Sequence, residues 1–381
     1  MKVGVVGLGL RASMVLGYLK AELPELEVMG YVDPQPCGLE RLAQTTPVGP
    51  ALPDLAALLK QKPEFLFVMS PNHLHLEHIR AGLEAGVRMF AEKPIVVSPE
   101  QTFALAELLA QHGTAQVQVG LVLRYARHAR DLRAAQEAGL LGDVVSIEAN
   151  EHIAPYHGAF FMRDWRRLSK YSGGFMLEKC CHDLDIYNMV TGSRPLRVAS
   201  FGGRSSFTPA HAPDSGADAV YQEKKSHWES AADSFASDAD IVDNQVAIVE
   251  YASGARLAFH TNSNVPDEHR RFCVIGTKGM AEGDFGRGFL KITDAHSRQA
   301  LKEHDYTDCP ETSVHYGADE LMARDLAAYL RGERPELPVS VVDCMEAGLA
   351  AMAIDQARAS GQVVDLRDWW DRLDACGLRK S

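Results

Sequence analysis

The first 123 residues alternate between short apolar runs and segments with helical spacing, and this alternation limits the folds open to the chain. Strands that are apolar along their whole length are buried on both faces, and the helices between them supply the crossovers of a parallel sheet. We therefore predict an N-terminal α/β domain over residues 1–123, a Rossmann-type doubly wound parallel sheet. The expected strands are Val3–Val6, Glu27–Val32, Phe65–Met69, Val87–Ala91 and Gln116–Leu123.

After residue 124 the pattern changes to hairpins. The runs Val246–Tyr251 and Ala255–His260 are separated by a Ser-Gly turn, which is typical of antiparallel strands. We predict a C-terminal α+β domain over 124–381, with a mostly antiparallel, open-faced sheet that binds substrate and self-associates. Residues 204–240 are rich in Ser, Ala, Asp and Gly with little periodicity, so we expect a long loop or insertion there.

Composition excludes several classes of function. The net charge is −12 and no block of Lys and Arg is present, so we expect no nucleic-acid partner. The apolar runs are far shorter than the roughly 20 residues of a membrane-spanning helix, so we expect no membrane segment. The seven cysteines are odd in number and scattered, which favours a reducing cytoplasm.

A glycine-rich turn follows the first strand and opens the first helix. In Gly7-Leu8-Gly9-Leu10-Arg11-Ala12, Gly7 permits a tight turn, Gly9 lets backbone approach a pyrophosphate, and Ala12 replaces the third glycine. The helix that begins near Leu10 and Arg11 can hold phosphate on its N-terminal amides. Asp33 ends the second strand, where a carboxylate accepts hydrogen bonds from ribose hydroxyls.

The position of Asp33 favours NAD over NADP, because a 2′-phosphate would meet negative charge there. NADP stays open, since Arg11 could support a phosphate. A flavodoxin-like domain without a dinucleotide is the other interpretation of this turn.

Three separated motifs make the sequence similar to the Gfo/Idh/MocA oxidoreductases over essentially its whole length. Ser70-Pro71-Asn72-His73-Leu74-His75 follows the third strand, Ala91-Glu92-Lys93-Pro94 follows the fourth, and Gly173-Gly174 leads to Glu178, His182 and Asp185. Two residues depart from the family pattern: Glu178 stands where Asp is common, and Cys180 where Gly is common. These departures suggest a distinct subgroup and leave the substrate open.

Hydride transfer from an alcohol needs a group that takes the hydroxyl proton. Lys93 and His182 are the candidates, and the resemblance implies that they share proton transfer and carbonyl polarisation. Glu178, His182 and Asp185 are spaced i, i+4 and i+7 and so share one face of a helix. The resemblance makes Glu178 the carboxylate that binds a substrate hydroxyl or orients the base. Such a face is usually a solvated stripe, or could hold a metal, but the resemblance supplies a nicotinamide oxidant and we expect no metal.

Further residues are placed at the site by the same resemblance. Those expected to bind the cofactor, in addition to the glycine-rich turn and Asp33, are Ser70, Asn72, His75, Glu92, Lys93, Arg124 and Arg166. Those expected to bind substrate, in addition to Lys93, Glu178 and His182, are Tyr156, Arg163 and His315. A surface role for Arg124 is nearly as good an interpretation, and we interpret Cys180 and Cys181 as small core residues rather than redox groups.

The function expected from these residues is NAD-dependent oxidation of a ring hydroxyl of a sugar, glycoside or cyclic polyol, or reduction of the matching ketone, with chemistry between the two domains. The first alternative is a glycosidase or lyase that oxidises its sugar transiently and recycles NAD. The second is a sensor that binds dinucleotide without turnover. The open sheet face and the resemblance predict a homodimer or homotetramer.

Overall fold

The computed structural model describes residues 1–214, 219–308 and 314–379, and these fall into two compact units. The first unit comprises residues 1–125, 318–348 and 370–381, and the second comprises 126–317 and 349–369. After Gly317 the chain therefore returns to the first unit. Each unit is described by itself below.

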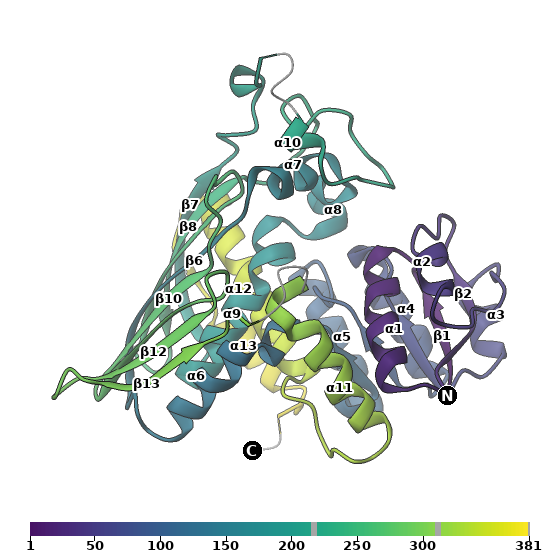
Figure 1. The fold of residues 1–381 in the computed structure, drawn as a ribbon, viewed down its shortest axis with the longest axis horizontal. Coiled ribbons are helices and arrows are strands. Elements are labelled where there is room, and N and C mark those ends of the chain that lie inside the picture. Colours follow the sequence, from purple (N-terminus) through teal and green to yellow (C-terminus); the bar gives the residue numbers. More distant parts are fainter. Residues whose placement is uncertain (215–218, 309–313, 380–381) are drawn as a thin grey trace. The chain divides into compact units, whose positions relative to one another are not determined.

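The first unit is built on a parallel sheet in the strand order β2-β1-β3-β4-β5 (Figure 1). Its strands are almost wholly buried, which explains their continuous apolar sequence. The order changes direction between β1 and β3, which is where an open α/β sheet binds its ligand. The strands are β1 (Lys2–Val6), β2 (Glu27–Val32), β3 (Phe65–Val68), β4 (Met89–Ala91) and β5 (Val117–Val119). The prediction of a Rossmann-type parallel sheet is confirmed.

Helices follow the strands of the first unit, as the sequence predicts. Ser98 accepts a hydrogen bond from the Gln101 N–H at 3.2 Å and so caps α5, while the Gln101 side chain accepts one from Val97 N at 3.0 Å. The helices of residues 1–125 are α1 (Leu10–Glu22), α2 (Leu39–Ala43), α3 (Leu55–Lys60), α4 (His75–Glu84) and α5 (Pro99–His112), with short η1 (Asn72–Leu74), η2 (Thr114–Gln116) and η3 (Val122–Tyr125).

The last predicted strand of the first sheet is shorter in the structure. The strand expected over 116–123 ends at Val119, because the chain turns at Gly120: the Gly120 N–H bonds to Ala91 O at 3.0 Å and Val122 N bonds to Gly120 O at 2.8 Å.

The later part of the chain adds α11 (Ala318–Leu330), which packs on α1. The remaining C-terminal elements are α12 (Val341–Ser360), β14 (Val364–Asp365) and α13 (Arg367–Asp374).

The second unit is built on a large sheet whose strand order, within the described residues, is β13-β12-β11-β10-β6-β9-β8-β7-β14. All neighbouring strands are antiparallel except β6 and β9, so the predicted mostly antiparallel sheet is confirmed. The strands are β6 (Val144–His152), β7 (Pro195–Gly203), β8 (Asn244–Tyr251), β9 (Arg256–Asn262), β10 (Arg271–Gly276), β11 (Gly279–Asp284), β12 (Phe289–Asp294) and β13 (Ala300–Asp305).

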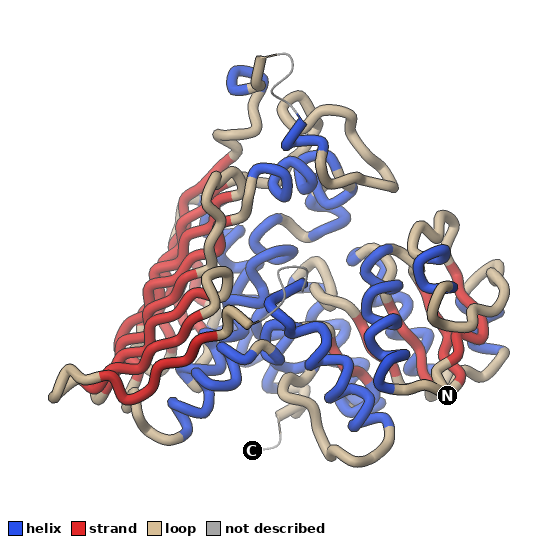
Figure 2. Tube along the Cα trace, in the orientation of Figure 1, coloured by secondary structure: helices blue, strands red, loops and turns tan. Residues whose placement is uncertain are grey.

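Helices cover one face of this sheet and leave the other open (Figure 2). The helices of residues 126–317 are α6 (Arg127–Glu137), α7 (Pro155–Arg163), α8 (Ser169–Ser172), α9 (Phe175–Thr191) and α10 (Ala219–Gln222), with short η4 (Trp165–Arg167), η5 (Pro209–His211) and η6 (Val314–Gly317). On the open face, Phe201 of β7 is paired with Val246 of β8, and their exposed fractions are 76% and 46%. The neighbouring Ile248 is 61% exposed.

The segment expected as a loop or insertion lies between β7 and β8. Its described parts, 204–214 and 219–240, are mostly irregular and hold only η5 and α10. Among the helices of the described residues, none is long and apolar enough to span a bilayer. The cytoplasmic location expected from the cysteines stays a prediction.

Candidate functional site

The glycine-rich turn lies against the loop that follows β3. Gly7 has a φ of 86°, and a Cβ built on it would stand 2.4 Å from Ser70 N, so no other residue fits without moving the backbone. In contrast, no described atom lies within 4 Å of a Cβ built on Gly9. Gly9 therefore borders open space at the carboxyl ends of β1 and β3, as expected of a surface that a pyrophosphate approaches closely.

The first turn of α1 offers its backbone N–H groups to this space. The helix begins at Leu10 after Gly9, no described side chain caps it, and no acidic residue occupies its first turn. An uncapped helix N-terminus carries partial positive charge and unsatisfied donors, which suit a phosphate. These features fit the pyrophosphate of a dinucleotide.

Asp33 holds the glycine-rich turn in shape. Its Oδ2 accepts a hydrogen bond from Leu8 N at 2.6 Å, and its Oδ1 accepts one from Gln35 N at 2.7 Å. Each carboxylate oxygen has a second lone pair, so both can still accept a hydrogen bond from a hydroxyl. Asp33 thus fits the acceptor expected for ribose hydroxyls, and the first unit as a whole fits NAD.

Arg11 points its side chain at two carboxylates. Its Nε lies 2.7 Å from Glu92 Oε1, and a terminal nitrogen lies 2.6 Å from Asp319 Oδ1. Burial alone would lower the pKa of Arg11, but the charges of Glu92 and Asp319 raise it above its ordinary value. The guanidinium is therefore engaged by carboxylates, and what remains proposed for Arg11 in phosphate binding is its backbone N–H in the first turn of α1.

His75 connects the loops that carry the first two motifs. The ring is fully buried, with Nδ1 2.9 Å from Pro94 O and Nε2 2.8 Å from Ser70 O. The ring therefore lies between the ends of β3 and β4 and fixes the loop that carries Lys93. The structure gives His75 a supporting position, and a contact of its side chain with the cofactor stays a prediction.

The other residues of these loops lie at the same edge of the sheet. Asn72 is buried in η1, and Lys93 is half-buried directly after Glu92. Glu92 Oε2 accepts a hydrogen bond from Lys93 N at 3.0 Å. Ser70 Oγ lies 2.9 Å from Nδ1 of His78, and burial lowers the pKa of His78 to about 4, so this ring is neutral near pH 7. The carboxyl edge of the first sheet thus gathers Gly7, Ser70, Glu92 and Lys93.

In the second unit, α9 carries the third motif. Gly173 ends α8 in a left-handed conformation with a φ of 82°, and a Cβ built on Gly174 would lie 2.7 Å from Asp355 Oδ2. Both glycines are thus required where α9 begins. Glu178, His182 and Asp185 are all buried along this helix, and their spacing puts them on the face that the sequence predicts.

Glu178 is paired with Arg166. Arg166 Nε lies 3.0 Å from Glu178 Oε1, and another guanidinium nitrogen lies 2.7 Å from Asp164 Oδ1. The guanidinium also lies over the Trp165 ring at 4.2 Å from its centroid. Burial alone would lower the pKa of Arg166, yet Asp164 and Glu178 raise it above its ordinary value. The longer carboxylate of this chain therefore reaches a fixed arginine.

His182 lies near His315, the other histidine that the sequence places at the substrate site. The ring centroids of His182 and His315 are 6.0 Å apart. His315 and Tyr316 both have left-handed backbone conformations, with φ of 51° and 59°. Such conformations are costly for residues other than glycine and often occur at functional sites. The turn that precedes α11 thus brings His315 to the helix that carries His182, which supports its predicted role.

A buried charge cluster that the sequence did not reveal also holds α9. Arg270 bonds to Asp183 at 2.5 Å and to Glu151 of β6 at 2.9 Å, and Lys179 bonds to Glu151 at 3.0 Å. Lys179 and Asp183 are one residue after Glu178 and His182, respectively, so this cluster sets the rotation of the helix. In the sequence, the i, i+4 spacing of Lys179 and Asp183 was the one sign of this cluster. Cys180 and Cys181 are buried, as expected of small core residues.

The remaining predicted residues make other contacts in the structure. Arg163 is buried and donates a hydrogen bond to Lys224 O at 2.8 Å. Tyr156 is half-buried and stacks on His157, with ring centroids 5.9 Å apart. Arg124 is buried and donates to Pro338 O at 3.4 Å, so the alternative of a surface arginine is wrong. Substrate and cofactor contacts of these three stay predictions.

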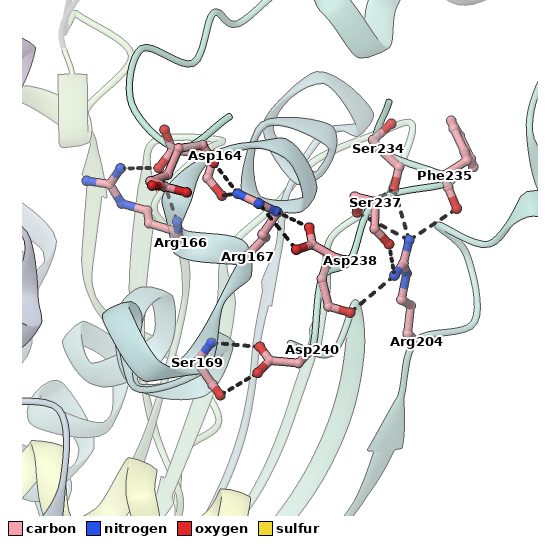
Figure 3. Close-up of polar contacts among 12 residues, drawn as sticks. Asp164, Arg166, Arg167, Ser169, Arg204, Ser234, Phe235, Ser237, Asp238 and Asp240 are labelled. Atoms are coloured by element: carbon pink, nitrogen blue, oxygen red, sulfur yellow. Dashed lines mark hydrogen bonds and ion pairs between the residues drawn. The ribbon is translucent and has the colours of Figure 1, made fainter. Parts of the chain in front are cut away.

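The insertion between β7 and β8 is docked on the loop that carries Arg166 (Figure 3). Arg167 forms an ion pair with Asp238, and Asp240 accepts hydrogen bonds from Ser169 N at 2.6 Å and Ser169 Oγ at 2.8 Å. Arg204 donates to the carbonyl oxygens of Ser234 and Phe235 at 3.2 and 3.1 Å and so holds the insertion's own backbone. Residues 226–240 of this segment thus contact Asp164 and its neighbours in the loop that carries Arg166.

Comparison with known proteins identifies both units. A family model described as an oxidoreductase family with an NAD-binding Rossmann fold matches residues 1–121, and a model described as the GFO/IDH/MocA C-terminal domain matches residues 129–282. The putative oxidoreductase YteT of Bacillus subtilis is 24% identical over 343 residues, which are 77% of this chain and 78% of YteT.

Two further relatives carry names that state an activity. Myo-inositol dehydrogenase Hyg17 of Streptomyces leeuwenhoekii is 29% identical over 206 residues, 54% of this chain and 60% of Hyg17. Scyllo-inositol dehydrogenase of Lactobacillus casei, solved with NAD(H) and scyllo-inositol, has a TM-score of 0.71 at 18% identity and covers 96% of this chain and 99% of its own. At this identity the structural likeness shows a shared fold.

Proposed function

Because this chain belongs to the Gfo/Idh/MocA oxidoreductase family and carries its NAD-binding domain, we propose that it transfers hydride between NAD and a ring hydroxyl of a sugar, glycoside or cyclic polyol. The names of the relatives favour cyclic polyols among these substrates: one is a myo-inositol dehydrogenase, and one was solved with scyllo-inositol.

The observation that carries the proposal is the arrangement of Glu178, His182 and Arg166. Glu178 and His182 are one helical turn apart on α9, both are buried, and Arg166 holds the carboxylate at 3.0 Å. A ring with several hydroxyls needs a fixed acceptor for one hydroxyl beside a group that exchanges a proton with another. A carboxylate oxygen has two lone pairs, so Glu178 can accept a hydrogen bond from a substrate hydroxyl while it stays paired with Arg166, and the imidazole of His182 can exchange the proton.

We propose the following division of roles. When bound, NAD accepts the hydrogen and its electron pair from the carbon that bears the hydroxyl. Lys93 and His182 share the proton of that hydroxyl: one group removes it during oxidation and returns it in the reverse direction, while the other donates a hydrogen bond to the carbonyl oxygen. Glu178 fixes a neighbouring hydroxyl, and Asp33 and the first turn of α1 hold the cofactor.

A glycosidase or lyase that recycles NAD remains the second candidate, because the same groups could oxidise a sugar transiently. The test is to incubate the purified protein with NAD and a panel of inositols, free sugars and aryl glycosides, and to follow both NADH and released aglycone. Net NADH without bond cleavage supports the proposed dehydrogenase. Release of aglycone without NADH would contradict it and favour the second candidate.

We further propose that the protein forms dimers or tetramers through the open face of its large sheet. Phe201, Val246 and Ile248 form an apolar patch on adjacent strands β7 and β8, and all three are at least 46% exposed. Contiguous exposed apolar side chains on a sheet are typical of a surface that another protein covers. A second copy of this chain offers the same patch and so can pair with it symmetrically.

A further inference from the structure

A serine of the insertion is connected to the proposed substrate carboxylate through hydrogen bonds. Ser226 Oγ donates to Asp164 Oδ2 at 2.8 Å. The other oxygen of Asp164 accepts from the backbone N of Arg166 at 3.3 Å and from its guanidinium at 2.7 Å. Arg166 Nε then donates to Glu178 Oε1 at 3.0 Å. The chain of contacts thus runs from the insertion to α9.

The insertion also supports Arg166 through a ring contact. Trp228, two residues after Ser226, packs with its ring centroid 6.2 Å from that of Trp165 and 5.3 Å from that of Tyr171. The Trp165 ring in turn lies under the guanidinium of Arg166. Trp165 therefore fixes the plane of the guanidinium, and the hydrogen bond to Asp164 fixes its rotation within that plane.

The Asp164 carboxylate depends on both of its contacts. Asp164 is 3% exposed, so water does not readily replace a lost partner. With Ser226 holding Oδ2, the carboxylate is fixed about its last torsion and presents Oδ1 to Arg166. Without that hydroxyl, a buried oxygen loses a donor, the carboxylate can rotate, and the guanidinium loses its fixed partner.

We propose that Ser226 is a positioning residue, which acts through Asp164 and Arg166 to hold Glu178 in the orientation that binds a substrate hydroxyl. The inference rests on the proposed function of Glu178. It assigns the insertion a part in catalysis, since the residue that fixes this carboxylate comes from a segment outside the three motifs. The glutamate that departs from the family's usual aspartate is thereby matched by an arginine and a serine that hold it.

The test compares Ser226→Ala with Ser237→Ala, which removes a hydroxyl of the same insertion that bonds to Arg204 and Ser234 instead. Loss of a hydrogen bond to a charged group predicts a fall of about tenfold in kcat/KM for the polyol in Ser226→Ala. Ser237→Ala should keep the wild-type kcat/KM. Equal values of kcat/KM in Ser226→Ala and the wild type would overturn the proposal.

A second background separates positioning from a general structural effect. In Glu178→Asp the carboxylate is one methylene shorter and no longer reaches Arg166, so Ser226→Ala should cost little more in that background. If Ser226→Ala lowers kcat/KM by the same factor in both backgrounds, Ser226 does not act through Glu178 and the proposal is wrong.

A structural measurement distinguishes failure of this inference from failure of the proposed function. If the wild type reduces no NAD with any polyol, the proposed function fails, and crystal structures of the wild type and Ser226→Ala at one pH decide the inference. We expect the Arg166–Glu178 pair, 3.0 Å in the wild type, to separate beyond hydrogen-bond distance in the variant. A pair that stays intact contradicts the positioning role.

Discussion

Among the single residues, several side chains hold the proposed reacting groups in place. Arg11 and Arg166 each join two carboxylates, Arg11 in the first unit and Arg166 in the second. In both residues the guanidinium is already paired with carboxylates of the protein, so it orients those carboxylates. Arginine suits this work because its planar group donates several hydrogen bonds in fixed directions.

Lys93 is the residue whose loss should affect chemistry most selectively. Removal of a group that transfers a proton typically costs about 10²–10⁴-fold, so we expect Lys93→Ala to lower kcat by that factor. Binding of NAD, measured by fluorescence titration, should be largely retained, because the uncapped N-terminus of α1 and Asp33 are untouched. The exposed lysine of α3 gives the control Lys60→Ala, which should behave as the wild type. Loss of NAD binding with unchanged kcat would contradict the assigned role.

Arg166→Lys tests whether the shape of the guanidinium matters. A lysine keeps the charge but cannot bond to Asp164 and Glu178 along two directions or lie flat on Trp165. We expect kcat/KM for the polyol to fall by about tenfold or more, in line with the loss of a charged hydrogen bond. Arg133→Lys, on the exposed side of α6, is the matched control. Full activity in Arg166→Lys would show that charge alone suffices.

At the level of secondary structure, α9 is positioned by a contact at its start and by a buried ion cluster along its length. Asp355 of α12 lies against Gly174, where α9 begins, and the cluster of Arg270, Glu151, Lys179 and Asp183 fixes the rotation of the helix. Removal of one member of a buried ion cluster typically costs about 3–5 kcal/mol, because its partners are left as uncompensated charges. Glu178 and His182 are therefore carried by a helix whose position and rotation are fixed.

Asp355 should make stability depend on pH. Burial raises its pKa from 3.8 to about 6, although Gln245 and Arg358 act in the opposite direction. The folded protein then keeps a proton that the unfolded chain has lost, so the contribution of Asp355 to the free energy of unfolding is largest below pH 3.8 and falls as pH rises through about 6. The fall is on the order of 3 kcal/mol at most.

Asp355→Asn removes this dependence. Relative to the wild type, the variant should gain unfolding free energy, measured by urea denaturation, as pH rises from about 4 to about 7. Asp371→Asn, at an exposed position of α13, is the control and should follow the wild type at every pH. If the difference between Asp355→Asn and the wild type is independent of pH, this side chain has an ordinary pKa in the folded state.

Local elements of this fold are readable from sequence, and distant contacts are not. The cap of α5 by Ser98 and the shared face of Glu178 and His182 follow from spacings of three or four residues. The pairs Arg11–Asp319 and Ser226–Asp164 join residues far apart in the chain, and only the folded chain brings them together. Equally, no local pattern announced the left-handed conformation of His315, since glycine is the residue that usually adopts it.

At the scale of the whole molecule, the open sheet face should control self-association. Phe201→Glu places a charge in the apolar patch, where it would be buried without a partner on pairing of two copies. We expect the variant to be a monomer by analytical ultracentrifugation while keeping its unfolding temperature. Leu301→Glu, also at an exposed apolar residue but on the edge strand β13, is the control and should keep the wild-type mass. An unchanged mass for Phe201→Glu would place any interface elsewhere.

The proposed reaction moves a hydride from a ring carbon of the substrate to NAD. The most direct measurement uses an inositol or glycoside that carries deuterium on its ring carbons, and follows the mass of the dinucleotide and the fate of the substrate together. We expect NADH to accumulate with one deuterium while the ring becomes a ketone and any glycosidic bond stays intact. Cleavage of the glycoside with no labelled NADH would contradict it.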